Sequence, residues 1–171
     1  MSNSEFPRPF DRRYPPGQAV VVEASPEECA ALAARFLLPA VHSLRAEITL
    51  LADGLAVLAN GRLKARVVQA CAVSGEDLPQ VVDEAVALRF VPEGAPATPG
   101  EEVEIGANEC DEIGYSGTQF DLGEALAQSL VLALDPFATG PGAEAARRAA
   151  GLLDEQASGP FAALAALKPK N

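Results

Sequence analysis

Apolar and polar residues alternate over positions 44–50, a pattern that predicts a β-strand with one buried face. The apolar side of this strand carries Leu44, Ala46, Ile48 and Leu50. Apolar runs bounded by turn or proline residues predict two more strands, at Ala19–Glu23 and Ala85–Val91. The stretch "EIGYSGTQF", residues 112–120, is expected to return to the same sheet.

The dipeptide Asn60-Gly61 separates two further apolar stretches, at residues 55–59 and 62–73. Because both residues tolerate positive φ, the pair predicts a two-residue hairpin turn. That turn would bring to one face the pairs Leu58 with Leu63 and Ala56 with Ala65. Side chains alternate along a strand, so the opposite face would carry Arg62, Lys64 and Arg66.

Two segments carry the capping and spacing signals of α-helices. In "SPEECAALAARF", Ser25 can cap the helix, Pro26 suits its first position and Glu28 completes a capping box. Helical spacing places on its core side Cys29, Leu32, Ala33 and Phe36. In "DLGEALAQSLVLAL", Asp121 and Glu124 are expected to form the same box. The apolar stack of this second helix consists of Leu122, Leu126, Leu130 and Leu134.

These elements predict an α+β fold, in which an antiparallel β-meander forms a partly closed sheet packed with two main helices. The proline-rich residues 1–17 predict an extended, flexible arm, and residues 18–137 predict one domain containing a mobile acidic loop at 92–111. Residues 138–171 form a tail rich in Ala, Gly and Pro. Its last piece, "GPFAALAALKPKN", is either a docking peptide or a helix that folds back or frays. One face of that piece carries Phe161, Leu164 and Leu167.

Charge divides the chain unevenly. The net charge is −11, and residues 76–124 hold thirteen acids against one cation, Arg89. Such a segment attracts basic partners and repels phosphate, although a solvated face that only aids solubility is the simpler alternative. The chain has no apolar run of the ~20 residues that span a bilayer, and its first residues lack the apolar core of a signal peptide. We therefore expect a cytoplasmic protein without membrane contact.

Residues that could support catalysis are few. The chain has a single histidine, His42, and an odd number of cysteines, Cys29, Cys71 and Cys110, without close spacing. It contains no glycine-rich phosphate loop, HExxH or CxxC pattern. We expect no catalytic residues, no metal and no cofactor. The alternative is an enzyme that performs metal-assisted hydrolysis with carboxylates of the acidic segment, Asp111, Glu112 and Asp121.

Four blocks in this order resemble the YceD-like family, also called large ribosomal RNA subunit accumulation proteins: "VVQACAVSGEDLP", "ALRFVPE", "FDLGEALAQSLVLALDPF" and "PFAALAALK". The resemblance extends from about Glu5 to Lys168. It implies a non-catalytic factor needed for normal accumulation of large-subunit rRNA in bacteria and plastids. Many members carry C-x-x-C where this chain has Cys71 and Ser74. Because a serine hydroxyl is a poor zinc ligand, we expect Cys71 to be a core residue at a strand end.

The resemblance and the charge pattern together predict an adaptor in ribosome assembly. Its acidic segment would hold a basic partner such as a ribosomal protein or a ribosomal precursor, and direct rRNA contact would come from one of two basic groups. One group is Arg62, Lys64 and Arg66, and the other is the arm's Arg8, Arg12 and Arg13. The first group is exposed, covered by acids of residues 76–124 or by Glu47, or in contact with phosphate. The oligomeric state stays open.

Overall fold

The computed structural model describes residues 4–94 and 111–152. Contacts divide these residues into two compact units: one contains residues 4–68, 79–94 and 111–134, and the other contains residues 69–78 and 135–152. The predicted boundaries of arm, domain and tail stay predictions. The apolar face of the tail, with Phe161, Leu164 and Leu167, lies outside the described residues.

Five strands form the main sheet in the order β2-β3-β4-β5-β6. They are β2 (Ala19–Glu23), β3 (Ala40–Asp53), β4 (Ala56–Ala70), β5 (Asp77–Pro92) and β6 (Asp111–Tyr115). β2, β3 and β4 pair antiparallel, whereas β6 pairs parallel to β5. The α+β class and the mostly antiparallel sheet are confirmed. The sheet is open rather than partly closed, because β2 and β6 are its two edges and do not pair with each other.

The predicted turn at Asn60-Gly61 is wrong. These two residues lie inside β4, where Asn60 faces Thr49 and Gly61 faces Ile48. The turn between β3 and β4 lies at Gly54, whose φ is 60°, and "ADG" at residues 52–54 does predict a turn there. A Cβ on Gly61 would lie 1.9 Å from the carbonyl oxygen of Glu47, so the glycine allows two strand backbones to approach closely.

Because β4 is continuous through Asn60 and Gly61, the predicted pairing of residues across that turn is also wrong. Leu58 and Leu63 lie on opposite faces, because they are an odd number of positions apart along one continuous strand. The same holds for Ala56 and Ala65. The face turned to the core carries Val57, Ala59, Leu63, Ala65 and Val67. On β3 the predicted core face is confirmed, with Leu44, Ala46, Ile48 and Leu50 all buried.

Both predicted helices are confirmed, as α1 (Pro26–Arg35) and α2 (Leu122–Leu132). At α1 the capping box is complete: the Ser25 hydroxyl accepts a bond from the Glu28 amide, and the Glu28 carboxylate accepts one from the Ser25 amide. Asp121 caps α2 by accepting from the Glu124 amide at 3.1 Å. The expected return bond is not formed among the described residues, because the Glu124 carboxylate accepts from Arg35 and Gln128 instead.

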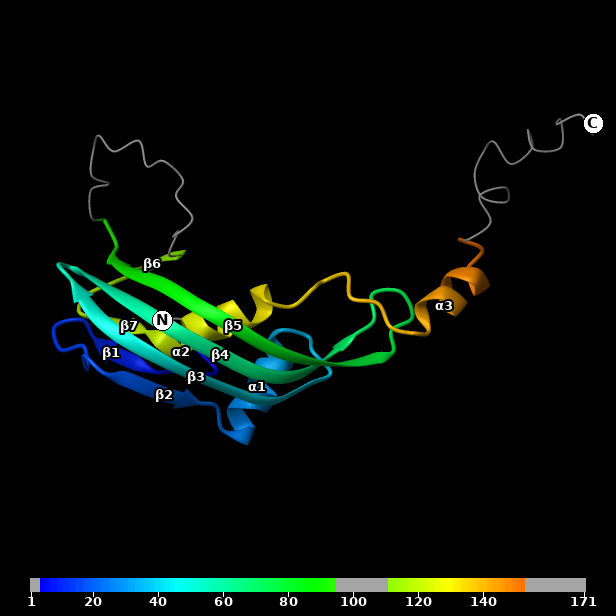
Figure 1. The fold of residues 1–171 in the computed structure, drawn as a ribbon, viewed down its shortest axis with the longest axis horizontal. Coiled ribbons are helices and arrows are strands. Elements are labelled where there is room, and N and C mark those ends of the chain that lie inside the picture. Colours follow the sequence, from blue (N-terminus) through cyan, green and yellow to red (C-terminus); the bar gives the residue numbers. More distant parts are fainter. Residues whose placement is uncertain (1–3, 95–110, 153–171) are drawn as a thin grey trace, which may run out of the picture. The chain divides into compact units, whose positions relative to one another are not determined.

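The helices complete one hydrophobic core with the inner face of the sheet (Figure 1). Cys29 and Leu32 of α1 belong to it, and Leu122, Leu126 and Leu130 of α2 have no exposed surface. Ala33 is also buried, whereas Phe36 and Leu134 are partly buried against this core. The opposite face of β3 and β4 remains uncovered by these helices, since its residues are mostly exposed.

Part of the N-terminal arm is paired and packed. Its strand β1 (Pro9–Asp11) forms a two-stranded antiparallel sheet with β7 (Gln119–Asp121). Phe6 is buried, and the ring of Phe10 lies 6.1 Å from that of Phe120, which in turn stacks on Phe90 at 4.3 Å. Three aromatic side chains therefore join the arm to the main sheet.

The strand predicted at residues 85–91 is part of the longer β5, which ends at Pro92 as expected. "EIGYSGTQF" does return to strand structure, within β6 and β7. Most of the predicted acidic loop, residues 95–110, lies outside the described residues. Among those that are described, no helix is long and apolar enough to cross a membrane. The short helix α3 (Ala143–Ala149) belongs to the second unit.

Candidate functional site

The exposed face of β3 and β4 gathers cations, as the alternation predicts. Arg62, Lys64 and Arg66 of β4 all point to solvent. The antiparallel register places Arg45 of β3 directly opposite Lys64, which adds a fourth cation to the group. We call Arg45, Arg62, Lys64 and Arg66 the basic face. Sequence reasoning missed Arg45, because only the register of a continuous β4 brings it beside Lys64.

Acidic residues neutralise only part of the basic face. Arg62 forms an ion pair with Asp83 of β5, and Glu47 lies opposite Arg62 across the β3–β4 pair. Asp83 raises the pKa of the Arg62 guanidinium, and Arg62 lowers the pKa of the Asp83 carboxyl. Asp83 belongs to the acidic segment, so the expected covering by that segment is found at Arg62. Within the described ranges, Arg45, Lys64 and Arg66 form no ion pair.

A shallow hollow of about 370 Å³ opens on this face. Three cations of the basic face, Arg45, Arg62 and Lys64, border it, together with polar residues that can donate or accept hydrogen bonds. These polar residues are Glu47, Thr49 and Asn60. The backbone of Gly61 also borders this hollow. The border of the hollow therefore carries three cations and one carboxylate, that of Glu47.

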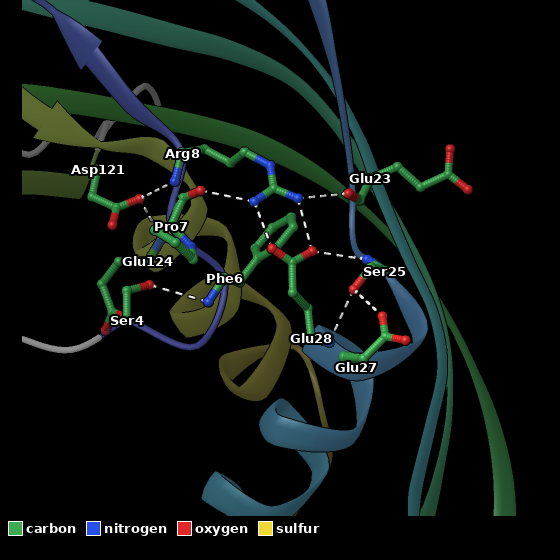
Figure 2. Close-up of polar contacts among 10 residues, drawn as sticks. All are labelled: Ser4, Phe6, Pro7, Arg8, Glu23, Ser25, Glu27, Glu28, Asp121 and Glu124. Atoms are coloured by element: carbon green, nitrogen blue, oxygen red, sulfur yellow. Dashed lines mark hydrogen bonds and ion pairs between the residues drawn. The ribbon is translucent and has the colours of Figure 1, made fainter.

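Arg8, the first cation of the arm, has protein partners on all sides. Figure 2 shows its guanidinium between α1 and the chain around Glu23: it donates to both carboxylate oxygens of Glu28, at 2.7 and 2.8 Å, and to the carbonyl oxygen of Glu23. Its backbone amide donates to Asp121, the cap of α2, at 2.8 Å. Hydrogen bonding by Arg8 is the main reason that the pKa of Glu28 is lowered. Arg8 therefore holds the arm to both helices.

The other two cations of the arm differ from Arg8. Arg13 bonds to the carboxylate of Asp11 two residues earlier, and this contact lowers the pKa of Asp11 to about 2. Arg12 uses its backbone amide to bond the carbonyl of Thr118, and no described residue forms an ion pair with its side chain. Three of the six predicted cations form no ion pair with a described residue: Lys64 and Arg66 on the sheet and Arg12 on the arm.

Cys71 lies in the second unit, in the turn that follows β4. The thiol is buried, and its sulfur accepts bonds from the amides of Ser74 at 3.3 Å and Gly140 at 3.4 Å. Hydrogen bonding by Ser74 is the largest cause that lowers the pKa of Cys71 to about 6, with the Gly140 amide adding to it. Burial agrees with the expected core position. The lowered pKa was not expected, because sequence reasoning looked for a neighbouring cation rather than for hydrogen bonds from the Ser74 side chain and from backbone amides.

Two of the three carboxylates of the hydrolase alternative already have structural partners, whereas Asp111 forms no ion pair with a described residue. Asp121 caps α2 and accepts from the amide of Arg8, while Glu112 pairs with Arg89 at 2.9 Å. No three Asp, Glu, His or Cys side chains of residues 4–94 and 111–152 form a group that could hold a metal ion. His42 is exposed on β3, beside a register shift between Val41 and Ser43.

Comparison with known proteins gives one match. A family model described as "Large ribosomal RNA subunit accumulation protein YceD" matches residues 59–168. The matched range begins in β4 and includes all four sequence blocks that carry the resemblance, but not the arm, β2, α1 or β3. Neither a curated protein nor a solved structure matches the chain.

Proposed function

This chain belongs to the YceD family of large ribosomal RNA subunit accumulation proteins, and we propose that it acts as a non-catalytic adaptor that contacts ribosomal RNA through its basic face. The family gives the role in large-subunit rRNA accumulation. The adaptor mechanism, the direct RNA contact and action in the cytoplasm, where bacterial ribosomes are assembled, are parts of the proposal.

The main support for RNA contact is that Arg45 and Lys64 face each other across neighbouring strands. Like charges directly opposite in a sheet repel each other, and Glu23 of β2, which lies opposite Arg45 on its other side, offsets part of this repulsion. An anion placed between them would turn repulsion into attraction. Arg66 extends the same row by one step, opposite Ser43. Three cations without described ion pairs thus line up on a protein whose net charge is −11.

The chemistry of this face suits the phosphate backbone rather than the bases. Proteins that bind single-stranded RNA commonly stack its bases on aromatic side chains. Neither β3 nor β4 contains a Phe, Tyr or Trp residue, and His42 is the one imidazole on these two strands. Exposed cations with Thr49 and Asn60 beside them are the groups that bond phosphate and sugar oxygens. We therefore propose contact with the backbone of folded rRNA, with little dependence on its base sequence.

The test compares two double variants that remove the same charge. Lys64→Gln with Arg66→Gln should fold normally, since both side chains are exposed, and should lower the fraction of protein that co-sediments with ribosomal precursors. The matched control is Arg147→Gln with Arg148→Gln in α3, which should co-sediment as wild type does. Arg62→Gln should have a smaller effect than Lys64→Gln, because Asp83 already neutralises Arg62.

Equal reduction in both double variants would show that only net charge matters, and the basic face would not be the site. Unchanged co-sedimentation of Lys64→Gln with Arg66→Gln, at both low and high salt, would also reject RNA contact by this face. In either case the arm's Arg12 becomes the next cation to replace.

A further inference from the structure

β5 has an open edge on the side away from β4. On that side β6 pairs only with Leu88–Pro92, and no other described strand pairs with the preceding residues of β5. Those backbone amides and carbonyls of residues 84–87 that point away from β4 therefore lack a strand partner among the described residues. Such an edge is a template onto which another extended chain can add.

A hollow of about 400 Å³ accompanies this open edge. One wall is β5 from Glu84 to Leu88, and the other is the C-terminal end of α2 with Leu132, which is 77% exposed. The five residues of β5 extend over about 17 Å, the length of a short added strand. The exposed side chain of Leu132 and the alanines of β5 offer apolar contacts to alternate side chains of such a strand.

The charge of the residues that line the hollow favours a positively charged partner. Two acids line it, Glu84 and Asp111, and no cation does. Neither acid forms an ion pair with a described residue. Glu84 also stands out in β5, because it falls on the side of the buried Val82 and Val86 yet is exposed.

An inward-pointing charge on an edge strand deters pairing with a second copy, since that copy would bring its own Glu84. The same charge favours a strand that carries cations. From the open edge, the hollow and its two acids, we propose that residues 84–88 of β5 bind an extended, lysine- or arginine-rich segment of a protein partner by β-strand addition. This inference rests on the adaptor proposed above and names the chemistry of its protein partner; its site is the edge of β5, whereas the basic face lies on β3 and β4.

The test uses the full chain and a synthetic ten-residue peptide that alternates Lys and Val. We expect the peptide to shift the amide NMR signals of residues 84–88 and to slow their hydrogen exchange. A peptide that alternates Glu and Val should not bind. Two further Lys/Val peptides, N-methylated at the odd or at the even residues, separate strand addition from charge attraction: at least one of them should fail to bind, because methylation removes the amide donors of one edge.

Protein variants test the two acids. Glu84→Gln with Asp111→Asn should weaken binding of the Lys/Val peptide about tenfold, since two surface charges that attract the peptide are removed. The matched control, Asp77→Asn with Glu144→Gln, removes two exposed acids outside the hollow and should bind within about twofold of wild type. Normal amide spectra of both variants would establish that they fold.

Four outcomes would reject the proposal: no binding at millimolar peptide, equal binding of the unmethylated and both methylated Lys/Val peptides, equal weakening in the control variant, or protection in the free chain of those amides of residues 84–87 that point away from β4. The last result would mean that the chain covers its own edge. No RNA is present in this test, so the peptide site and the RNA contact can each fail alone.

Discussion

At Gly61 the backbone of β4 lies close to the backbone of β3. A Cβ there would lie 1.9 Å from the carbonyl oxygen of Glu47, so Gly61→Ala must push β3 and β4 apart. We expect a decrease of roughly 1–3 kcal/mol in the free energy of unfolding, as for other overpacked sites. Urea titration followed by circular dichroism measures it. The exposed neighbour serves as control, and Asn60→Ala should change stability by less than about 0.5 kcal/mol. A Gly61→Ala variant as stable as wild type would contradict the close approach.

The sequence around Cys71 does not indicate the low pKa of its thiol. Burial should make alkylation of Cys71 by iodoacetamide slow at every pH, but because the pKa is lowered to about 6, the rate relative to its maximum should reach one half near pH 6 and level off above neutrality. Peptide mass spectrometry distinguishes Cys71 from Cys29, whose pKa burial raises. Ser74→Ala removes the largest cause of the shift and should move the midpoint upward. A rate for Cys71 in wild type that still rises through pH 8.5 would contradict the thiolate assignment.

At the scale of elements, the arm is held by one arginine. Arg8 contacts Glu28 of α1, the carbonyl of Glu23 at the end of β2 and, through its amide, the cap of α2. Arg8→Ala leaves the partly buried Glu28 carboxylate without its partner. We expect a decrease of about 1–2 kcal/mol in the free energy of unfolding, discounted for the 29% exposure of the Arg8 side chain.

Limited proteolysis provides the second measurement for the arm. Arg8→Ala should make cleavage within residues 4–17 faster, because the arm separates from the helices more often. Arg12→Ala is the matched control, since the Arg12 side chain forms no ion pair with described residues and only its backbone amide bonds Thr118. Equal cleavage rates in the two variants would show that the aromatic contacts of the arm suffice.

The two helices are joined by an ion pair between Arg35 of α1 and Glu124 of α2. Arg35 lowers the pKa of Glu124 from 4.5 to about 2. A depressed carboxyl pKa contributes stability above the unfolded value, and that stability is lost as the pH falls from about 4.5 towards 2. Glu124→Gln should lower the free energy of unfolding by roughly 2 kcal/mol at pH 7, and it should make this free energy depend less on pH below about 4.5. Urea titrations at several pH values measure both effects. If the stability of Glu124→Gln fell with decreasing pH as steeply as that of wild type, the ion pair would be contradicted.

At the scale of the whole molecule, a net charge of −11 coexists with one row of cations. Binding of a short RNA duplex should therefore be weak and should fall steeply with salt. With about three phosphates bound, by Arg45, Lys64 and Arg66, we expect a slope of log K against log salt between roughly −2 and −3. Lys64→Gln with Arg66→Gln should reduce the slope by about one unit for each phosphate that is no longer bound. Fluorescence anisotropy at four salt concentrations measures it, and an unchanged slope would place the RNA contact elsewhere.

Local patterns predicted the features that depend on neighbours in the sequence. Spacing of three or four residues suffices for the capping box of Ser25 and Glu28 and for the buried stack of α2, because both form within one or two helical turns. Alternation likewise suffices to place Lys64 and Arg66 on an exposed face, since the period of a strand is set by its own backbone. The α+β class follows from the order of these elements.

Only the tertiary structure reveals the features that depend on contacts between residues distant in the sequence. Asn60-Gly61 has the local signal of a turn, but pairing of β4 with β3 along its whole length outweighs it. The same pairing brings Arg45 to Lys64, and the docked arm gives Arg8 its contact with Glu28, twenty residues away. The parallel pairing of β6, which leaves the edge of β5 open, also has no local signal. Register and long-range contacts arise from the packing of whole elements, and no spacing along the chain encodes them.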